Sequence, residues 1–213
     1  MRKRLWILFL SLFFGFSTPA LAQQKATQTN YALARQAKEN GEWEKAISYY
    51  EELYQKTEAD LYYRELVELY LETENYKEAE KLIKKRVRKN PEQLAHIVDQ
   101  GLLEEKQGNE KEAAKFYDEA VAELDRDPQQ ARLLANQFNR YQKYAYTEAV
   151  YLKTRKLNKN DELFRFELAN ALAQQGKTSE MIEIYLDVVG NNRNYIQTVQ
   201  NIFSRVLYPD PEG

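Results

Sequence analysis

The chain has 213 residues, 30% of them charged and 43% hydrophobic, which is typical of a folded protein rather than a disordered one. It has no cysteine and one histidine, which excludes disulfides, thiol nucleophiles, cysteine-based metal sites and multi-histidine centres. The formal net charge of −2 favours neither nucleic acid nor an anionic membrane as a partner.

The first 22 residues have the three parts of a secretory signal peptide. Basic residues at positions 2–4 precede an apolar run from Leu5 to Phe16, and Ala20-Leu21-Ala22 offers a small-x-small cleavage site. The apolar run is shorter than the roughly 20 residues that span a bilayer. The sequence therefore predicts a signal peptide over 1–22 and export to the periplasm or cell envelope of a Gram-negative bacterium, with an uncleaved anchor as the alternative. Residues 23–28 are expected to form a short linker.

A short pattern recurs five times along the rest of the chain. Each copy has a turn, an aromatic or polar residue, a Glu or Lys, and then a small or apolar residue. This last position falls at Ala46, Ala79, Ala113, Ala149 and Met181, at intervals of 33, 34, 36 and 32 residues. Within each period two apolar stripes at helical spacing are separated by the turn, which predicts a pair of antiparallel helices. Each pair has an apolar face that only the next pair can cover.

Two details of the pattern carry further expectations. Asn90-Pro91 and Asp127-Pro128 are predicted to open the helices that follow them, since Asn and Asp cap helices and proline suits the first turn. The fourth copy departs from the others, and we expect two extra residues near 142–144. In that register Lys153 stands at a position where an aromatic residue is expected.

These copies resemble the tetratricopeptide repeat (TPR) family. The second copy matches its pattern at Tyr63, Leu66, Tyr70, Ala79 and Pro91, and the third at Gly101, Ala113, Tyr117 and Ala120. The resemblance implies an all-α, right-handed superhelix of about five stacked helix-turn-helix repeats, at about 27–59, 60–93, 94–129, 130–161 and 162–190. Residues 191–208 are predicted to form a capping helix or a truncated sixth repeat, and 209–213 a flexible tail.

The resemblance also implies where a partner binds. In this family the first helix of each repeat lines a concave groove, and its inward positions carry over to this chain as Tyr31, Arg35, Lys38, Arg64, Glu68, Leu71, Val98, Leu102, Glu105, Phe166 and Asn170. The family's clamp for a carboxylate uses a Lys/Asn pair in the first repeat, and the pair Arg35 and Lys38 does not supply it. The alternative is that these residues only pack against neighbouring helices.

No pattern predicts catalysis, a cofactor or a metal site. His96 is expected to be a packed or surface residue, the basic run over 81–89 a solvated helix face, and most of the 16 tyrosines packing residues. We expect a non-catalytic scaffold that binds a protein or peptide segment and not nucleic acid. One alternative is the N-terminal TPR part of a larger envelope assembly, transport or signalling protein. Another is a glycan-binding module, which requires Tyr31 and Phe166 to be exposed on one concave patch.

Overall fold

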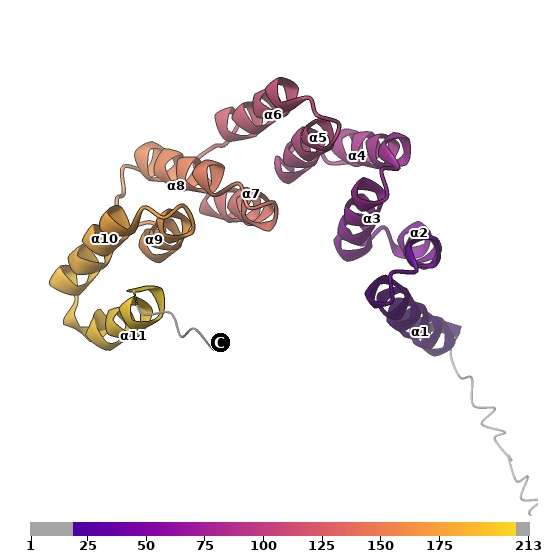
Figure 1. The fold of residues 1–213 in the computed structure, drawn as a ribbon, viewed down its shortest axis with the longest axis horizontal. Coiled ribbons are helices and arrows are strands. Elements are labelled where there is room, and N and C mark those ends of the chain that lie inside the picture. Colours follow the sequence, from indigo (N-terminus) through magenta and orange to yellow (C-terminus); the bar gives the residue numbers. More distant parts are fainter. Residues whose placement is uncertain (1–18, 208–213) are drawn as a thin grey trace, which may run out of the picture. The chain divides into compact units, whose positions relative to one another are not determined.

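The structure, a computed structural model, describes the backbone of residues 19–207 and the side chains of residues 27–206. Its described residues form α-helices, one 3-10 helix and no strand, which confirms the predicted all-α class (Figure 1). The elements are α1 Pro19–Glu39, α2 Trp43–Thr57, α3 Asp60–Glu72, α4 Tyr76–Lys89, α5 Ala95–Lys106, α6 Glu110–Ala122, α7 Pro128–Arg140, α8 Tyr144–Asn158, α9 Arg165–Gln174, α10 Thr178–Asn191, η1 Arg193–Tyr195 and α11 Ile196–Leu207.

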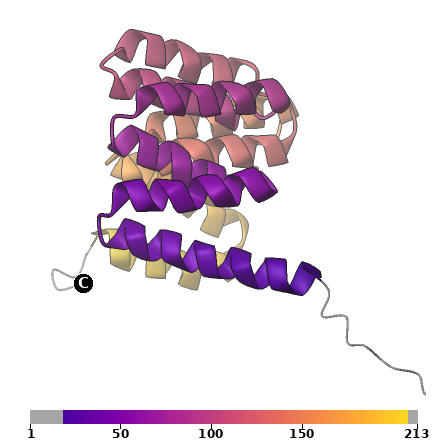
Figure 2. The same ribbon diagram turned by 90° about the vertical axis from the view of Figure 1, so that its right-hand side faces the viewer.

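The helices follow one another as five hairpins, which are α1 with α2, α3 with α4, α5 with α6, α7 with α8 and α9 with α10 in the described part of the chain. The chain falls into two compact units, one ending at Leu69 and the other beginning at Tyr70. In the first unit, α1 and α2 run antiparallel and are joined by a short turn (Figure 2). In the second unit, α5, α7 and α9 lie on one side and α6, α8 and α10 on the other (Figure 1).

The N-terminal boundary differs from the prediction. Helix α1 begins at Pro19 and includes residues 23–28, which are helical rather than a linker. No glycine or proline interrupts residues 20–39, so nothing local ends the helix there. The predicted signal peptide lies outside the described residues up to position 18, and the predicted tail over 209–213 lies wholly outside them.

The turn inside every hairpin has the same backbone form. One residue per turn has a positive φ, and these residues are Gly41, Glu74, Gly108, Gln142 and Gly176, with φ of 73°, 57°, 83°, 57° and 73°. The N–H of the residue that follows each of them bonds to the carbonyl five residues earlier, at 2.8–3.0 Å; Glu42 to Ala37 and Lys143 to Phe138 are two of these bonds. This is the helix-ending motif in which a left-handed residue lets the last N–H groups satisfy free carbonyls. The turns recur at intervals of 33, 34, 34 and 34 residues.

This constant turn corrects the predicted register of the fourth repeat by two residues. The turn lies at Gln142, so the position of the small residue is taken by Thr147, which is fully buried, and not by Ala149. The aromatic position four residues later is then Tyr151, also buried. The fourth repeat therefore has no insertion. The pair Glu148-Ala149 has the same sequence as the Glu-Ala pair in other copies of the pattern. For this reason the sequence pattern indicates Ala149, rather than Thr147, as the small residue.

Lys153 has a different role from the one its predicted position suggested. Its ammonium group donates to the carbonyl of Val121 at 2.8 Å and to that of Ala122, at the C-terminal end of α6. Positive charge is favourable at this end of a helix, where carbonyls lack partners within the helix. Lys153 thus links α8 to α6 in the preceding repeat.

The two predicted proline openings behave differently. Asp127 caps α7 as expected, since its side chain accepts from the N–H of Gln129 at 2.9 Å and Pro128 follows it. The prediction for Asn90-Pro91 is wrong, because Asn90 ends α4 and the next helix begins only at Ala95. Asn90 donates its backbone N–H to the carbonyl of Arg86, so it extends the hydrogen bonding of α4.

The hairpins of the second unit share one core. Buried residues from α5 through α11 form a single cluster that includes Val98, Phe138, Leu168 and Val199. Each hairpin therefore buries its remaining apolar face against its neighbours, as the repeat pattern predicts. Helix α11 packs against this core through Val199, which is buried, and Phe203, which is partly buried. The centroid of the Phe203 ring lies 5.8 Å from that of the Tyr185 ring.

Candidate functional site: a partner-binding face on the first helices

Three tyrosines from the three helices of the first unit form an aromatic cluster. The ring centroids of Tyr31, Tyr50 and Tyr62 lie 5.9–6.4 Å apart. Tyr50 and Tyr62 are buried, whereas Tyr31 is half-buried and forms the accessible edge of the cluster. Burial, followed by the nearby charge of Glu65, raises the pKa of Tyr50, so its hydroxyl stays neutral and can donate a hydrogen bond.

A lysine held by two carboxylates lies beside this cluster. The ammonium of Lys38 in α1 donates to Glu65 at 2.8 Å and to Glu68 at 3.0 Å, both in α3. Burial lowers the pKa of Lys38, but the hydrogen bonds to both carboxylates outweigh this effect and the pKa is raised overall. Lys38 is therefore charged at neutral pH and fixes the spacing of α1 and α3.

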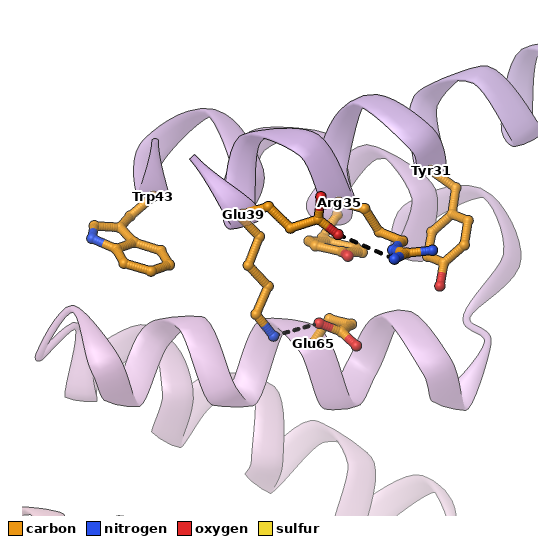
Figure 3. A pocket seen from close by; sticks show the side chains of 7 residues that line it. Tyr31, Arg35, Glu39, Trp43 and Glu65 are labelled. Carbon is orange, nitrogen blue, oxygen red and sulfur yellow. Dashed lines mark hydrogen bonds and ion pairs between the residues drawn. The ribbon is translucent and has the colours of Figure 1, made fainter. Parts of the chain in front are cut away.

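These residues surround a pocket of about 400 Å³ in the first unit (Figure 3). Its lining residues are Tyr31, Arg35, Lys38, Glu39, Trp43, Tyr50 and Glu65. Arg35 bonds to Glu39 at 3.1 Å, and both side chains are well exposed. Since an exposed ion pair of this kind contributes little to stability, the guanidinium can exchange Glu39 for an acceptor on a partner at small cost. Trp43 is 37% exposed at one end of the pocket and offers an apolar surface.

The structure brings several predicted residues together here. Tyr31, Arg35 and Lys38 line one pocket, and Glu68 bonds to Lys38. Arg64 is half-buried. The prediction did not include Glu65 and Trp43, which also line the pocket. Glu65 follows Arg64, the residue that was predicted to point inward. Trp43 is the first residue of α2, whereas the prediction considered first helices alone.

In the second unit the predicted inward residues are less available. Val98 is fully buried in the shared core and Leu102 is buried too, as is Leu71 at the end of α3. Glu105 is half-buried and already accepts from the Tyr117 hydroxyl at 3.0 Å and the Lys143 ammonium at 2.6 Å. Val98 and Leu102 therefore offer little surface to a partner in this structure.

The two predicted residues of the fifth repeat differ from each other. Asn170 is exposed and Phe166 is half-buried. The Phe166 ring lies 5.9 Å from that of Tyr185 and 5.3 Å from that of Tyr195. Like Tyr31, it packs against two other aromatic rings. This geometry does not favour the open stacking surface that the glycan-binding alternative requires.

A buried polar network in the second unit was not predicted. Asp99 in α5 is 1% exposed and accepts from the Tyr141 hydroxyl at 2.6 Å and from the amide of Gln137, while His96 Nδ1 lies 3.4 Å from its other oxygen. Burial, and then the charge of Asp99, raises the pKa of Tyr141 well above its usual range. The bonds from Gln137 and Tyr141 to Asp99 connect α5 with the end of α7 and help to fix their relative position. In the sequence, the network is indicated by the three-residue spacing of His96 and Asp99, which puts both on one helix face. His96 is buried, which confirms that it is a packing residue.

The described part of the chain offers neither a metal site nor a membrane span. Among these residues no three acidic or histidine side chains lie close enough to hold a metal ion. None of the described helices is both long and apolar enough to cross a membrane. The arrangement instead supplies what a binding face needs: aromatic surface, an exchangeable cation and fixed carboxylates.

Comparison with known proteins finds a repeat family whose sequence profile matches part of the chain. Residues 37–98 match the sequence profile of the tetratricopeptide repeat. No curated protein matches the sequence of the chain. With the five constant hairpins, the match confirms the predicted TPR resemblance. Repeats of this family are in general non-catalytic interaction modules.

Three solved structures have similar helical arrangements at 14% sequence identity. The RS-1 ArsTM double mutant of MamA matches over 80% of this chain and 97% of its own, with a TM-score of 0.39. A further MamA structure matches over 82% and 96%, also with a TM-score of 0.39. The complex of the TPR2AB domain of yeast Sti1 with pHSP90 matches over 80% and 79%, with a TM-score of 0.40.

Proposed function

We propose that the protein is a non-catalytic scaffold of the bacterial cell envelope that binds a segment of a partner protein at the pocket of the first unit. The observation that carries this proposal is the pocket itself, in which an exposed arginine, an aromatic edge and an indole converge on one open volume. Arg35 suits a carboxylate or backbone carbonyl of the partner, and Tyr31 and Trp43 suit an apolar side chain beside it. Because Lys38 and its carboxylates are already fixed, little ordering is required when the partner binds.

A site-specific cross-linking experiment tests the binding face. A photoreactive amino acid replaces Tyr31 in the full chain within cells, and in a parallel strain it replaces Lys56, which is exposed near the end of α2. We expect a discrete cross-linked partner from position 31 and not from position 56. In the background Arg35→Glu this product should fall on the order of tenfold, because the substitution replaces an attraction with a repulsion.

Arg126→Glu is the matched control, because Arg126 is also exposed and its side chain makes no hydrogen bond or ion pair within the described residues; its backbone carbonyl accepts from Asn158. It should leave the product unchanged. The same product from positions 31 and 56, or equal loss with both arginine variants, would remove the pocket from the proposal.

The envelope location rests on the N-terminal pattern alone. If the signal peptide is cleaved as proposed, the mature chain begins at Gln23, and N-terminal sequencing of protein from a periplasmic fraction should read Gln-Gln-Lys. Protein that retains Met1 in the cytoplasm would contradict the location and leave the binding face unaffected.

A further inference from the structure

A groove in the second unit lies between α8 and α10. It has a volume of about 640 Å³. Its apolar floor comes from Leu168 and Leu172 of α9, which are both buried. Because α9 contacts both α8 and α10, the groove runs over α9 with one helix as each wall.

The walls are helix faces rather than loops. Glu148, Leu152 and Arg155 follow one another at spacings of four and three residues on α8, so they share one stripe. On α10, Glu183, Ile184 and Asp187 follow Glu180 by three, four and seven residues, so these side chains also share one stripe. Rigid helices therefore present both rows, and the shape of the groove does not depend on a flexible segment.

Large apolar side chains stand open at the rim. Leu152 on α8 is 46% exposed and Leu186 on α10 is 59% exposed, and both line the groove together with Ile184. Single exposed leucines are common on protein surfaces. Two that flank an apolar floor give a continuous surface that a partner can cover.

The charge around this apolar surface is strongly one-sided. Glu180, Glu183 and Asp187 are exposed, and none of them makes an ion pair or hydrogen bond within the described residues. Glu148 is already satisfied, by Lys177 at 2.7 Å and Gln175 at 2.9 Å. Arg155 is the one cation among the lining residues, and its Nε is taken by the carbonyl of Leu163 at 2.7 Å.

We propose that this groove is a docking surface for a basic amphipathic helical segment of another protein, which places apolar side chains on the leucine floor and Lys or Arg against the carboxylates of α10. The acidic row on one wall selects the charge of the segment, and the depth over Leu168 and Leu172 accommodates its apolar side chains. The same carboxylates repel an anionic membrane surface. This surface shares no lining residue with the pocket that contains Arg35.

Binding of designed peptides to the full chain tests the proposal. The probe is a fluorescent helical peptide of leucine and lysine with its leucines on one face, and its control has glutamate at every lysine. We expect saturable binding of the lysine peptide, weakening with added salt, and no binding of the glutamate peptide. The triple reversal Glu180→Lys, Glu183→Lys and Asp187→Lys should weaken binding by on the order of tenfold or more.

Two further variants distinguish binding in the groove from non-specific attraction of the peptide to acidic residues elsewhere on the surface. Glu110→Lys, Glu119→Lys and Glu123→Lys change the net charge equally but lie along α6 and its C-terminal end, away from the groove, and all three residues are exposed. This control should bind like the unaltered chain, whereas Leu152→Ser with Leu186→Ser should weaken binding at unchanged charge. Equal weakening by both triple variants would overturn the proposal. Concentration-dependent self-association of the chain that Leu186→Ser abolishes would also overturn it, in favour of a second copy as the occupant.

Discussion

At Gly101 the backbone of α5 approaches the aromatic ring of α6 without room for a side chain. A β-carbon there would lie 2.3 Å and 2.6 Å from two ring carbons of Tyr117 and 3.1 Å from the carbonyl oxygen of Ala113. The ring cannot easily move, because it is buried and its hydroxyl bonds to Glu105. The small residue at this position of the repeat is therefore required by a specific contact between helices.

We expect Gly101→Ala to lower the free energy of unfolding by about 1–3 kcal/mol, the usual cost of overpacking a core. The loss should appear although alanine favours a helix over glycine by about 1 kcal/mol. Gly190→Ala in α10 is the control, because a β-carbon added there would meet no atom of a neighbouring element within 4 Å. Urea unfolding followed by circular dichroism should move the midpoint down for Gly101→Ala and leave it unchanged or higher for Gly190→Ala. A rise in both would show that the contact is not tight.

The turn residues Glu74 and Gln142 adopt a left-handed backbone that glycine adopts in the other three turns. A residue with a β-carbon pays roughly 1–2 kcal/mol for this conformation. We therefore predict that Gln142→Gly stabilises the chain by about 0.5–1 kcal/mol, because relief of strain is partly offset by the entropy of glycine in the unfolded chain. The reverse change, Gly108→Ala, should destabilise by a similar amount, since φ there is 83°. Thermal unfolding of both variants checks the prediction, and shifts of the same sign would contradict it.

At the scale of helices, the sequence allowed the hairpins to be predicted but not every register. Five copies of a pattern fix the number of pairs, because each copy ends one helix and starts another. The register predicted for the fourth repeat was wrong because Ala149 resembles the small residue of the other copies. In the structure Thr147 is the buried residue, and its hydroxyl donates to the Asn139 side chain at 2.8 Å. A buried threonine with its own hydrogen-bond partner satisfies the same packing requirement, and the repeat pattern does not include that option.

Helix α11 is held by one face only. Val199 is buried against the preceding repeat, and the neighbouring Thr198 is exposed. We predict that Val199→Asp undocks α11, because burying an unpaired carboxylate costs more than the roughly 2–4 kcal/mol that burial of Val199 and part of Phe203 contributes. Hydrogen exchange measured by mass spectrometry should show lost protection in residues 196–207 and little change in α7. Thr198→Asp is the control and should keep protection; equal protection in both variants would show that α11 does not depend on this contact.

At the scale of the whole chain, the residues of the candidate site were only partly predictable from the sequence. The positional rule identified Tyr31, Arg35 and Lys38, because in the first repeat those positions border an open pocket. The same rule also selects Val98, which is buried because neighbouring repeats of the second unit cover it with a shared core. The rule assigns inward positions within a single repeat. It therefore contains no information about which side chains are buried by the next repeat. Contacts over long separations, such as Glu65 with Lys38, also lie outside it.

Buried tyrosines give the whole chain a predicted sensitivity to alkaline pH. Burial raises the pKa of Tyr50, Tyr117, Tyr141 and Tyr151, with a value of about 12 for Tyr151. Nearby carboxylates, such as Glu105 beside Tyr117, add to the effect. A tyrosine with a raised pKa in the folded protein ionises more easily once unfolded. Its contribution to stability is therefore complete below the unfolded pKa near 10 and is lost as the pH rises through the folded pKa.

We expect helicity to be constant up to about pH 10 and to fall between about pH 10 and pH 12, with tyrosinate absorbance rising in the same interval. Lys38 acts in the same direction, because its pKa is raised above 10.5 and its bonds to Glu65 and Glu68 are lost when it deprotonates. The urea-unfolded chain is the control, since all its tyrosines should ionise near pH 10. If the folded chain instead ionised every tyrosine near pH 10 and kept its helicity, the buried hydroxyls would have no part in holding the repeats together. Joint loss of helicity and gain of tyrosinate would show that these hydroxyls must stay protonated for the hairpins to remain packed.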